Sequence, residues 1–230
     1  MGRPFTFINS AMSADGKIST KGRKQTRISG DVDFDRMDEL RASSDAVMVG
    51  IGTVLADDPS LTVKSEERRA ARKANGCEEN PIRVVVDSHA RTPIDADIFK
   101  KGEGIRVIAV SKSAPRERVK VLEEMAVVIV AGEDRVDLPE LVLQLKAMGI
   151  DRLMVEGGAG LNFGMLSCGL VDEIYSFVGN LIIGGTTSPT LVDGMGFEQG
   201  EIMGLEFLSC DRMDDGVVLK WRVNAAQVFD

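Results

Sequence analysis

The stretch from residue 151 to residue 164, DRLMVEGGAGLNFG, carries the pattern that decides the fold. Its apolar first half, DRLMVE, predicts a strand, and the glycines after it permit positive φ and a close approach of a ligand to the backbone. A helix beginning near Leu161 would point unpaired N–H groups at an anion. A Rossmann fingerprint, however, belongs in the first βαβ unit and is followed about 20 residues later by an acid. Neither condition holds here, so the stretch alone indicates either a generic glycine bend or a phosphate-binding turn.

Short apolar runs alternate with helical patterns before this stretch. The expected strands are residues 5–12, 45–50, 82–87, 105–110 and 126–131. After it, strands are expected in DEIYSFVGNLIIGG, GLEFLSCDRM and GVVLKWRV, with no convincing helix between them. The alternating units predict a parallel sheet with helices on its faces, and the final run predicts antiparallel strands added to that sheet. We therefore expect an α/β fold in a single domain over residues 1–230.

The first helical pattern follows Ser29 and Asp31, either of which could cap the helix. Its apolar residues Phe34, Met37 and Leu40 lie three apart, which predicts an amphipathic helix. This face is expected to lie against the core.

Later helices have clearer end signals. One is expected from about residue 113 to residue 125. Another begins at Asp137-x-x-Glu140, which resembles a capping box, and ends at Gly149. The charged segment 65–81 contains few apolar residues, so it is predicted to be a solvated loop or helical excursion.

The composition disfavours several classes of function. Acidic residues number 36 and basic residues 28, for a net charge of −8, which argues against nucleic-acid binding. The sequence has neither a signal-peptide pattern nor an apolar run of membrane-spanning length, so we expect a cytoplasmic protein without membrane attachment. The cysteines, Cys77, Cys168 and Cys210, and the single histidine, His89, form no metal-binding spacing, so we expect no metal site.

Polar residues gather after the predicted strand 45–50, in VGIGTVLADDPSLTVK (49–64). Thr53 supplies a hydroxyl near an expected helix start, and the pair Asp57–Asp58 precedes a helix-ending proline. A turn, a short helix and a solvated acidic pair form the simplest interpretation. That interpretation does not explain the density of polar groups at the end of a strand, where open α/β sheets bind ligands.

A second polar group follows the first predicted strand, in NSAMSADGKIST (9–20). Asp15-Gly16 is a turn dipeptide, and Lys17 follows it. A plain hairpin tip would account for this segment, and Arg41 and Arg91 could each be surface charges.

The segments SAMSADGKIS, LRASSDAVMVGIGTVLADDPSLTVK, IRVVVDS and VEGGAGLNFGMLSCGLVDEI occur in this order. Together they resemble the reductases of riboflavin biosynthesis, from about Pro4 to Val223, and most closely the stand-alone archaeal and fungal type. The string GTVLADDPSLT and VEGG-x-x-L-N in one chain make the match specific. Bifunctional bacterial relatives carry a zinc deaminase with His-x-Glu and Pro-Cys-x-x-Cys. Those residues are missing here, so the resemblance implies reduction without a fused deaminase.

The resemblance implies a dihydrofolate-reductase-like fold, with a mixed, mostly parallel sheet, flanking helices and antiparallel C-terminal strands. It also implies a homodimer that uses NADPH as hydride donor, with NADH as an alternative donor. The implied reaction reduces the ribosyl side chain of 2,5-diamino-6-ribosylamino-4(3H)-pyrimidinone 5′-phosphate and yields the ribitylamino product.

Residue by residue, the resemblance supplies a site. It places cofactor contacts at Thr53, Asp57, Ser88, Gly132, Gly157, Gly158, Ala159 and Gly160. It places substrate contacts at Asn9, Lys17, Arg41, Leu61, Lys64 and Glu156. Within this set, Lys17 would steady the sugar hydroxyls or developing charge, and Glu156 would bind the ribityl or amino groups.

The chain departs from the bacterial pattern at two of the matched positions. Lys64 stands where that pattern has an arginine, so the charge is kept but the bidentate phosphate geometry is lost. Arg27 stands where it has an aromatic residue, so stacking on the cofactor is not expected there.

Two other functions stay open. One is a dihydrofolate- or pterin-type reductase on the same fold, since a fold does not determine a substrate. The other is an NADP-binding regulatory protein that has lost catalysis. The order of the matched segments disfavours the first, and the intact Asp15-Gly16-Lys17, Asp57 and Glu156 disfavour the second.

Overall fold

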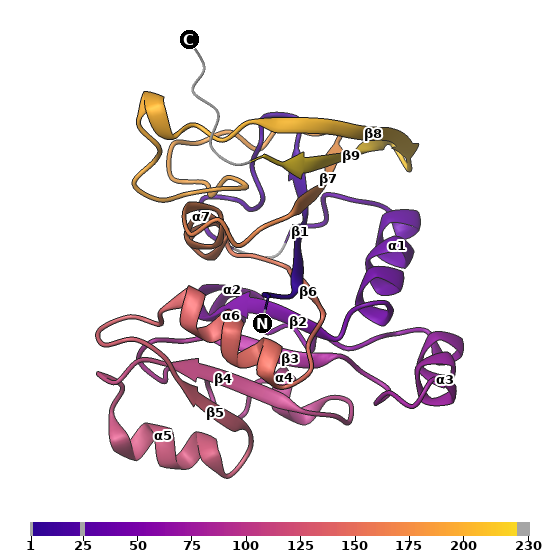
Figure 1. Cartoon of the computed structure of the whole chain (residues 1–230). Helices are drawn as coiled ribbons and strands as arrows, with labels where there is room; N and C mark the ends of the chain where they lie inside the picture. Colours follow the sequence, from indigo (N-terminus) through magenta and orange to yellow (C-terminus); the bar gives the residue numbers. More distant parts are fainter. Residues whose placement is uncertain (1, 24–25, 225–230) are drawn as a thin grey trace. The chain divides into compact units, whose positions relative to one another are not determined.

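The computed structural model describes residues 2–23 and 26–224 (Figure 1). The chain divides into two compact units. The first unit contains Arg36–Met154 and the N-terminal residues up to Pro4, and the second contains Phe5–Asp35 and the residues from Val155 onward. Among the described residues, no helix combines the length and apolar character needed to cross a membrane.

The first unit is built on five strands of the sheet. They are hydrogen-bonded in the order β5 (Val127–Val130), β4 (Arg106–Val110), β3 (Ile82–Val86), β2 (Ala46–Gly50) and β6 (Arg152–Val155). Each neighbouring pair from β2 to β5 is parallel. Continuous runs of β-branched residues form these strands because both faces are covered; Val84, Val85 and Ile108 are fully buried. The helices of this unit are α2 (Ile51–Asp57), α3 (Glu66–Ala74), α4 (Asp97–Lys100), α5 (Arg116–Glu123) and α6 (Leu138–Ala147).

The second unit combines parallel and antiparallel pairing. Its strands run in the order β1 (Phe5–Ser13), β7 (Glu173–Gly179), β9 (Gly216–Val223) and β8 (Leu205–Met213) (Figure 1). β1 and β7 are parallel, whereas β7–β9 and β9–β8 are antiparallel. The helical elements of this unit are α7 (Ala159–Ser167) and the short 3₁₀ helix Gln199–Glu201. The mixed, mostly parallel strand pairing with flanking helices and antiparallel C-terminal strands confirms the predicted fold class.

Helix α1 (Asp31–Ala42) begins in the second unit and ends in the first, and its predicted apolar face is wrong. Phe34 is 41% exposed, and the Arg27 guanidinium lies over its ring at 5.5 Å. The buried residues include Asp38 and Arg41, at 4% and 6% exposure. Burial of these charged groups is offset by hydrogen bonds, since Asp38 accepts backbone N–H groups and Arg41 donates to the Thr62 carbonyl at 3.2 Å.

The cap of α1 also differs from the prediction. Instead of Ser29 or Asp31, the carboxylate of Asp214, in the turn between β8 and β9, accepts from Val32 N at 3.3 Å and Asp33 N at 3.0 Å. The Asp214 carboxylate packs directly against Gly30, since a Cβ atom at position 30 would lie 2.4 Å from Asp214 Cγ. A larger residue at this position would therefore displace the cap.

The ends of α6 are partly as predicted. Asp137 caps the helix by accepting from Glu140 N at 2.8 Å, and Gly149 follows its end with φ of +90°. The reciprocal half of the predicted capping box is wrong, because the Glu140 carboxylate accepts from Gly132 N at 3.0 Å.

The segment 65–81 contains α3, whose residues are not buried, which confirms the predicted helical excursion.

Candidate functional site

The loops after β3, β4 and β5 are joined by hydrogen bonds at the carboxyl ends of these parallel strands. Ser111 Oγ donates to the Ser88 carbonyl at 2.7 Å, and Lys112 N donates to the Gly132 carbonyl at 3.0 Å. Ser88 Oγ accepts from Val136 N at 3.0 Å. The structure thereby places Ser88 and Gly132 on one connected rim, at the side of the sheet where α/β proteins bind ligands.

The backbone of this rim requires glycine at position 132. It has φ of +77°, and a Cβ there would lie 2.3 Å from the Arg135 carbonyl oxygen. Its N–H donates to Glu140 and its carbonyl accepts from Lys112. A ligand that used either group would therefore replace or share a protein hydrogen bond.

The carboxylate of Asp87, which precedes Ser88, was not singled out by the sequence. It is fully buried and accepts from Thr92 N at 2.7 Å, Thr92 Oγ1 at 2.8 Å and Arg91 Nε at 3.3 Å. These bonds hold the turn that follows β3 and so determine where Ser88 begins its loop. The turn chemistry of DSHART was the available signal, because Asp commonly bonds to nearby backbone groups.

Thr53 and Asp57 lie four residues apart on α2, so they share one face of that helix. Gly50 stands at its N-cap without a side-chain cap, and Asp58 ends it with φ of +43°. Partial desolvation raises the pKa of the Asp57 carboxyl. The predicted short helix followed by a proline is confirmed.

Lys64 and Arg41 meet around Thr62. Lys64 Nζ donates to Thr62 Oγ1 at 2.8 Å and to Ser60 Oγ at 2.9 Å, and Arg41 donates to the Thr62 carbonyl. Leu61, between the two hydroxyls, is buried and has φ of +53°. Desolvation lowers the pKa of Lys64, and the positive charges of Arg41 and Lys101 lower it further. A cluster of cations and hydroxyl groups of this kind is suited to an anion.

In the second unit, Lys17 lies in a tightly bonded turn after β1. Its Nζ donates to the Ser188 carbonyl at 2.9 Å, and its backbone N donates to Ser13 Oγ at 2.9 Å. Ser13 Oγ donates to Asp15, whose carboxylate also accepts from Gly184 N at 2.7 Å. The Ser13 hydroxyl contributes most to lowering the pKa of Asp15 to about 2. The turn predicted at Asp15-Gly16 is confirmed, and the ammonium group of Lys17 is held by this frame.

A cavity of about 830 Å³ opens beside Lys17 in the second unit. Hydroxyl-bearing residues Thr186, Thr187 and Ser188 contribute to its wall, together with the apolar side chains of Phe163 and Phe197. The sequence did not point to this segment because it has neither strand nor helix periodicity. Its signals are the turn dipeptides Gly184-Gly185 and Asp193-Gly194.

Asn9 lies within β1, 7% exposed and opposite Tyr175 of β7. Glu156, half-buried, follows the end of β6. The two residues stand on or beside strands, which are more rigid positions for ligand-binding groups than long loops.

The glycine turn follows Glu156. Gly157 has φ of +96°, and the Gly157–Gly158 peptide bond is cis. Helix α7 then begins at Ala159, two residues before the predicted start, and its N-cap Gly158 supplies no side-chain cap. The first N–H groups of the helix are therefore suited to an anion, and Gly160 has open space at its Cβ position.

Asn162, the last residue of the VEGG-x-x-L-N motif, lies in the first turns of α7 and was not among the predicted site residues. It is fully buried, and its Nδ2 donates to the Leu191 carbonyl at 2.8 Å. Its Oδ1 has no hydrogen-bond partner within the described part of the chain. Asn162 thus ties the wall of the cavity to the helix that begins at the glycine turn.

A family model described as the RibD C-terminal domain matches residues 4–219, so the chain belongs to that family. It is 52% identical over 195 residues to the 2,5-diamino-6-ribosylamino-4(3H)-pyrimidinone 5′-phosphate reductase of Archaeoglobus fulgidus, covering 85% of this chain and 89% of the relative. It is 45% identical over 222 residues to the protein of the same name from Methanothermobacter thermautotrophicus, covering 96% and 99%. These matches confirm the resemblance found in the motifs.

A solved structure supports the fold assignment independently. The riboflavin biosynthesis reductase Rib7 of Saccharomyces cerevisiae superposes with a TM-score of 0.74 at 21% identity. The superposition covers 96% of this chain and 90% of that one. At this identity the likeness establishes a shared fold.

Proposed function

We propose that this chain is a reductase of riboflavin biosynthesis. It reduces the ribosyl side chain of 2,5-diamino-6-ribosylamino-4(3H)-pyrimidinone 5′-phosphate to the ribitylamino product, with NADPH as hydride donor and NADH as an alternative. The observation that carries this proposal is the likeness to relatives at 52% and 45% identity over nearly their whole lengths, both named as this reductase. The nearly complete coverage matters because a partial match could transfer only a domain.

Each unit offers groups that suit part of a dinucleotide cofactor. The uncapped start of α7, after the positive φ of Gly157, suits a phosphate, and the rim at Ser88 offers polar groups at strand ends. We assign cofactor contacts to Thr53, Asp57, Ser88, Gly132, Gly157, Gly158, Ala159 and Gly160. When bound, NADPH supplies the hydride, and the protein supplies binding and orientation.

We assign substrate contacts to Asn9, Lys17, Arg41, Leu61, Lys64 and Glu156. Lys64 and Arg41 bind the phosphate, since Lys64 donates to the Thr62 hydroxyl and Arg41 to the Thr62 carbonyl, which brings two cationic groups to one residue. The ammonium group of Lys17 has three N–H donors, one of which bonds to Ser188; the others can hold sugar hydroxyls beside the reacting carbon. The carboxylate of Glu156 accepts hydrogen bonds from the ribityl or amino groups, so Lys17 and Glu156 are the residues we assign to catalysis.

We further propose a single reductase domain, a homodimer and a cytoplasmic location. Edge strand β8 exposes Leu205 and Phe207, which a second copy could cover. The exposed free thiols of Cys77, Cys168 and Cys210 are compatible with a reducing compartment. Light scattering would test the dimer, and a monomer at micromolar concentration would refute it.

The activity is tested by following NADPH absorbance with the purified protein and each of two substrates. Oxidation is expected with the diaminopyrimidine ribosyl phosphate and not with dihydrofolate. Oxidation with dihydrofolate alone would establish the other reductase function, and binding of NADPH without oxidation would establish a regulatory role. Repeating the assay with NADH measures the preference between the two donors.

A further inference from the structure

The turn after α4, Lys101–Gly104, packs against the segment that carries Lys64. A Cβ on Gly102 would lie 2.7 Å from the Cγ2 methyl group of Thr62. The other branch of the same side chain, Oγ1, accepts from Lys64 Nζ at 2.8 Å. Lys101 is the residue beside Gly102, and after desolvation and the charge of Arg41 its positive charge is a further cause of the lowered pKa of Lys64. The turn therefore brings a further cation to the Lys64 cluster.

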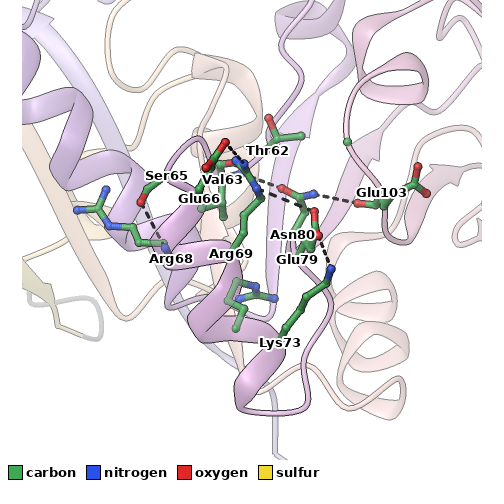
Figure 2. A network of polar contacts seen from close by, with 12 residues as sticks. Thr62, Val63, Ser65, Glu66, Arg68, Arg69, Lys73, Glu79, Asn80 and Glu103 are labelled. Carbon is green, nitrogen blue, oxygen red and sulfur yellow. Dashed lines mark hydrogen bonds and ion pairs between the residues drawn. The ribbon is translucent and has the colours of Figure 1, made fainter.

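Asn80 joins the two segments (Figure 2). This side chain is 2% exposed; its Oδ1 accepts from Val63 N at 2.9 Å, and its Nδ2 donates to the Glu103 carbonyl at 3.0 Å. A single buried amide thus sets the spacing between the backbone beside Lys64 and the turn of Lys101. Because both bonds are to backbone groups, the spacing does not depend on flexible side chains.

Buried Arg83 holds the turn from within. Its guanidinium donates to the carbonyl oxygens of Lys101 at 2.6 Å, Gly102 at 3.1 Å and Glu103 at 3.1 Å. Arg106 adds a hydrogen bond of 2.6 Å to the Gly102 carbonyl. Desolvation, together with the nearby charge of Arg106, lowers the pKa of Arg83 to about 10. The backbone that carries Lys101 is therefore held by several charge-assisted bonds.

The ammonium group of Lys101 is ion-paired with Asp97, four residues earlier. Asp97 is itself positioned by its backbone N–H, which donates to Asp58 Oδ1 at 2.8 Å. The Lys101 side chain is 59% accessible and that of Asp97 is 26% accessible, so the ion pair is open to solvent on the lysine side. Exposed pairs of this kind contribute little stability, so a doubly charged anion nearby can compete for the lysine.

We propose that Lys101 is a further cation of the phosphate site, and that it selects for the phosphorylated form of the substrate together with Lys64, Arg41 and the hydroxyls of Ser60 and Thr62. The inference rests on the proposed function, because it concerns the phosphate group of that substrate. Asp97 holds Lys101 at the edge of the site when no phosphate is bound, and the anion shares or takes over the ammonium group when it binds.

The test measures binding of ribose 5-phosphate and of ribose to the full chain by isothermal titration calorimetry. Lys101→Met should raise the Kd for ribose 5-phosphate about 5- to 10-fold, and the effect should shrink at high salt. Lys100→Met removes the same charge one residue earlier and should leave this Kd unchanged. Equal effects of the two substitutions, or no effect of Lys101→Met, would overturn the proposal, as would failure of the wild-type chain to bind ribose 5-phosphate more tightly than ribose.

A second substitution tests whether Lys101 itself binds the phosphate, or whether only the overall positive charge of the cluster matters. Asp97→Asn releases Lys101 and should lower the Kd for ribose 5-phosphate about 2- to 3-fold. The gain should vanish in the double variant Asp97→Asn/Lys101→Met, and a gain that persisted would contradict the role of Lys101. These binding measurements do not depend on turnover. If the wild-type enzyme were inactive, the proposed reaction would be refuted, but the binding data would still decide whether Lys101 belongs to the phosphate site.

Discussion

Lys17 and Lys64 are both assigned to substrate, but their surroundings differ. The ammonium group of Lys17 donates to a backbone carbonyl, that of Ser188, in a turn held by the carboxylate of Asp15. The ammonium group of Lys64 donates to the hydroxyls of Ser60 and Thr62, with further cations nearby. Lys17 is therefore positioned by a frame, whereas Lys64 stands in an environment that disfavours its own charge.

The difference indicates different tasks. A frame that fixes one donor is suited to orienting the reacting part of a substrate, where a small displacement costs rate. A cluster whose cations repel one another is suited to binding an anion, because the anion relieves the repulsion. Substitution of the first lysine should therefore act mainly on kcat, and substitution of the second mainly on KM.

The largest effect is expected for Lys17→Met. It should lower kcat by about 100-fold, because a donor beside the reacting carbon is lost. Steady-state kinetics of NADPH oxidation would measure it, with Lys21→Met as the control for loss of an exposed charge in the following loop. Wild-type turnover and substrate affinity in Lys17→Met would remove Lys17 from the mechanism.

A smaller effect, confined to KM, is expected for Lys64→Met. KM for the phosphorylated substrate should rise about 10-fold or more because a charge-assisted bond is lost, while kcat stays close to that of the wild type. Lys64→Arg keeps the charge and should recover most of the affinity. A fall in kcat without a change in KM would show that Lys64 does not act mainly in binding the phosphate, and would contradict the distinction between the two lysines.

The lowered pKa of Lys64 adds a pH dependence to this comparison. Desolvation is its largest cause, and the charges of Arg41 and Lys101 add to it. Since only the protonated amine attracts phosphate, KM should begin to rise on the alkaline side at a lower pH than for an ordinary lysine. The arginine variant should not show this rise, because its guanidinium stays protonated.

The smallest effect on turnover is expected for Asp15→Asn, about 3-fold, because the turn keeps its backbone bonds and Lys17 shifts only slightly. The pKa of Asp15 is lowered from 3.8 to about 2, so its stabilising effect is present above pH 3.8 and is lost as the pH falls toward 2. Melting temperatures of wild type and Asp15→Asn should therefore converge across this window. Asp95→Asn serves as an exposed control. A difference in melting temperature that did not change with pH would mean that the carboxylate does not stabilise the turn through its charge.

Several elements were readable from local sequence. The β-branched runs that became β3 and β4 were predicted to within a residue or two, because strands covered on both faces need continuous apolar side chains. Gly149 and Gly157 stand where positive φ is required, as the turn signals indicated. Local rules also pointed to the turn of Lys17 and to the glycine turn, since these follow the ends of β1 and β6. Lys64 was reached only through the family motifs.

Other features depended on partners far along the chain. The cap of α1 comes from Asp214, 181 residues after Asp33, so no local pattern near Ser29 could reveal it. The buried side of α1 is polar because Asp38 and Arg41 bond to the segment 62–65, and helical periodicity counts only apolar residues. Glu140 left the expected capping box because the N–H of Gly132, eight residues before it, was within its reach.

By itself, the sequence determined the alternation of strands and helices, the positions of the special glycines and the family motifs, because each depends on residues close together in the chain. Only the tertiary structure decided which charges are satisfied and by what. It showed that Asn80 and Arg83 hold the turn of Lys101 against the segment that carries Lys64, and that Asp15 holds the turn of Lys17. Buried or clustered polar groups must find hydrogen-bond partners wherever the folded chain provides them, and sequence spacing carries no record of those encounters.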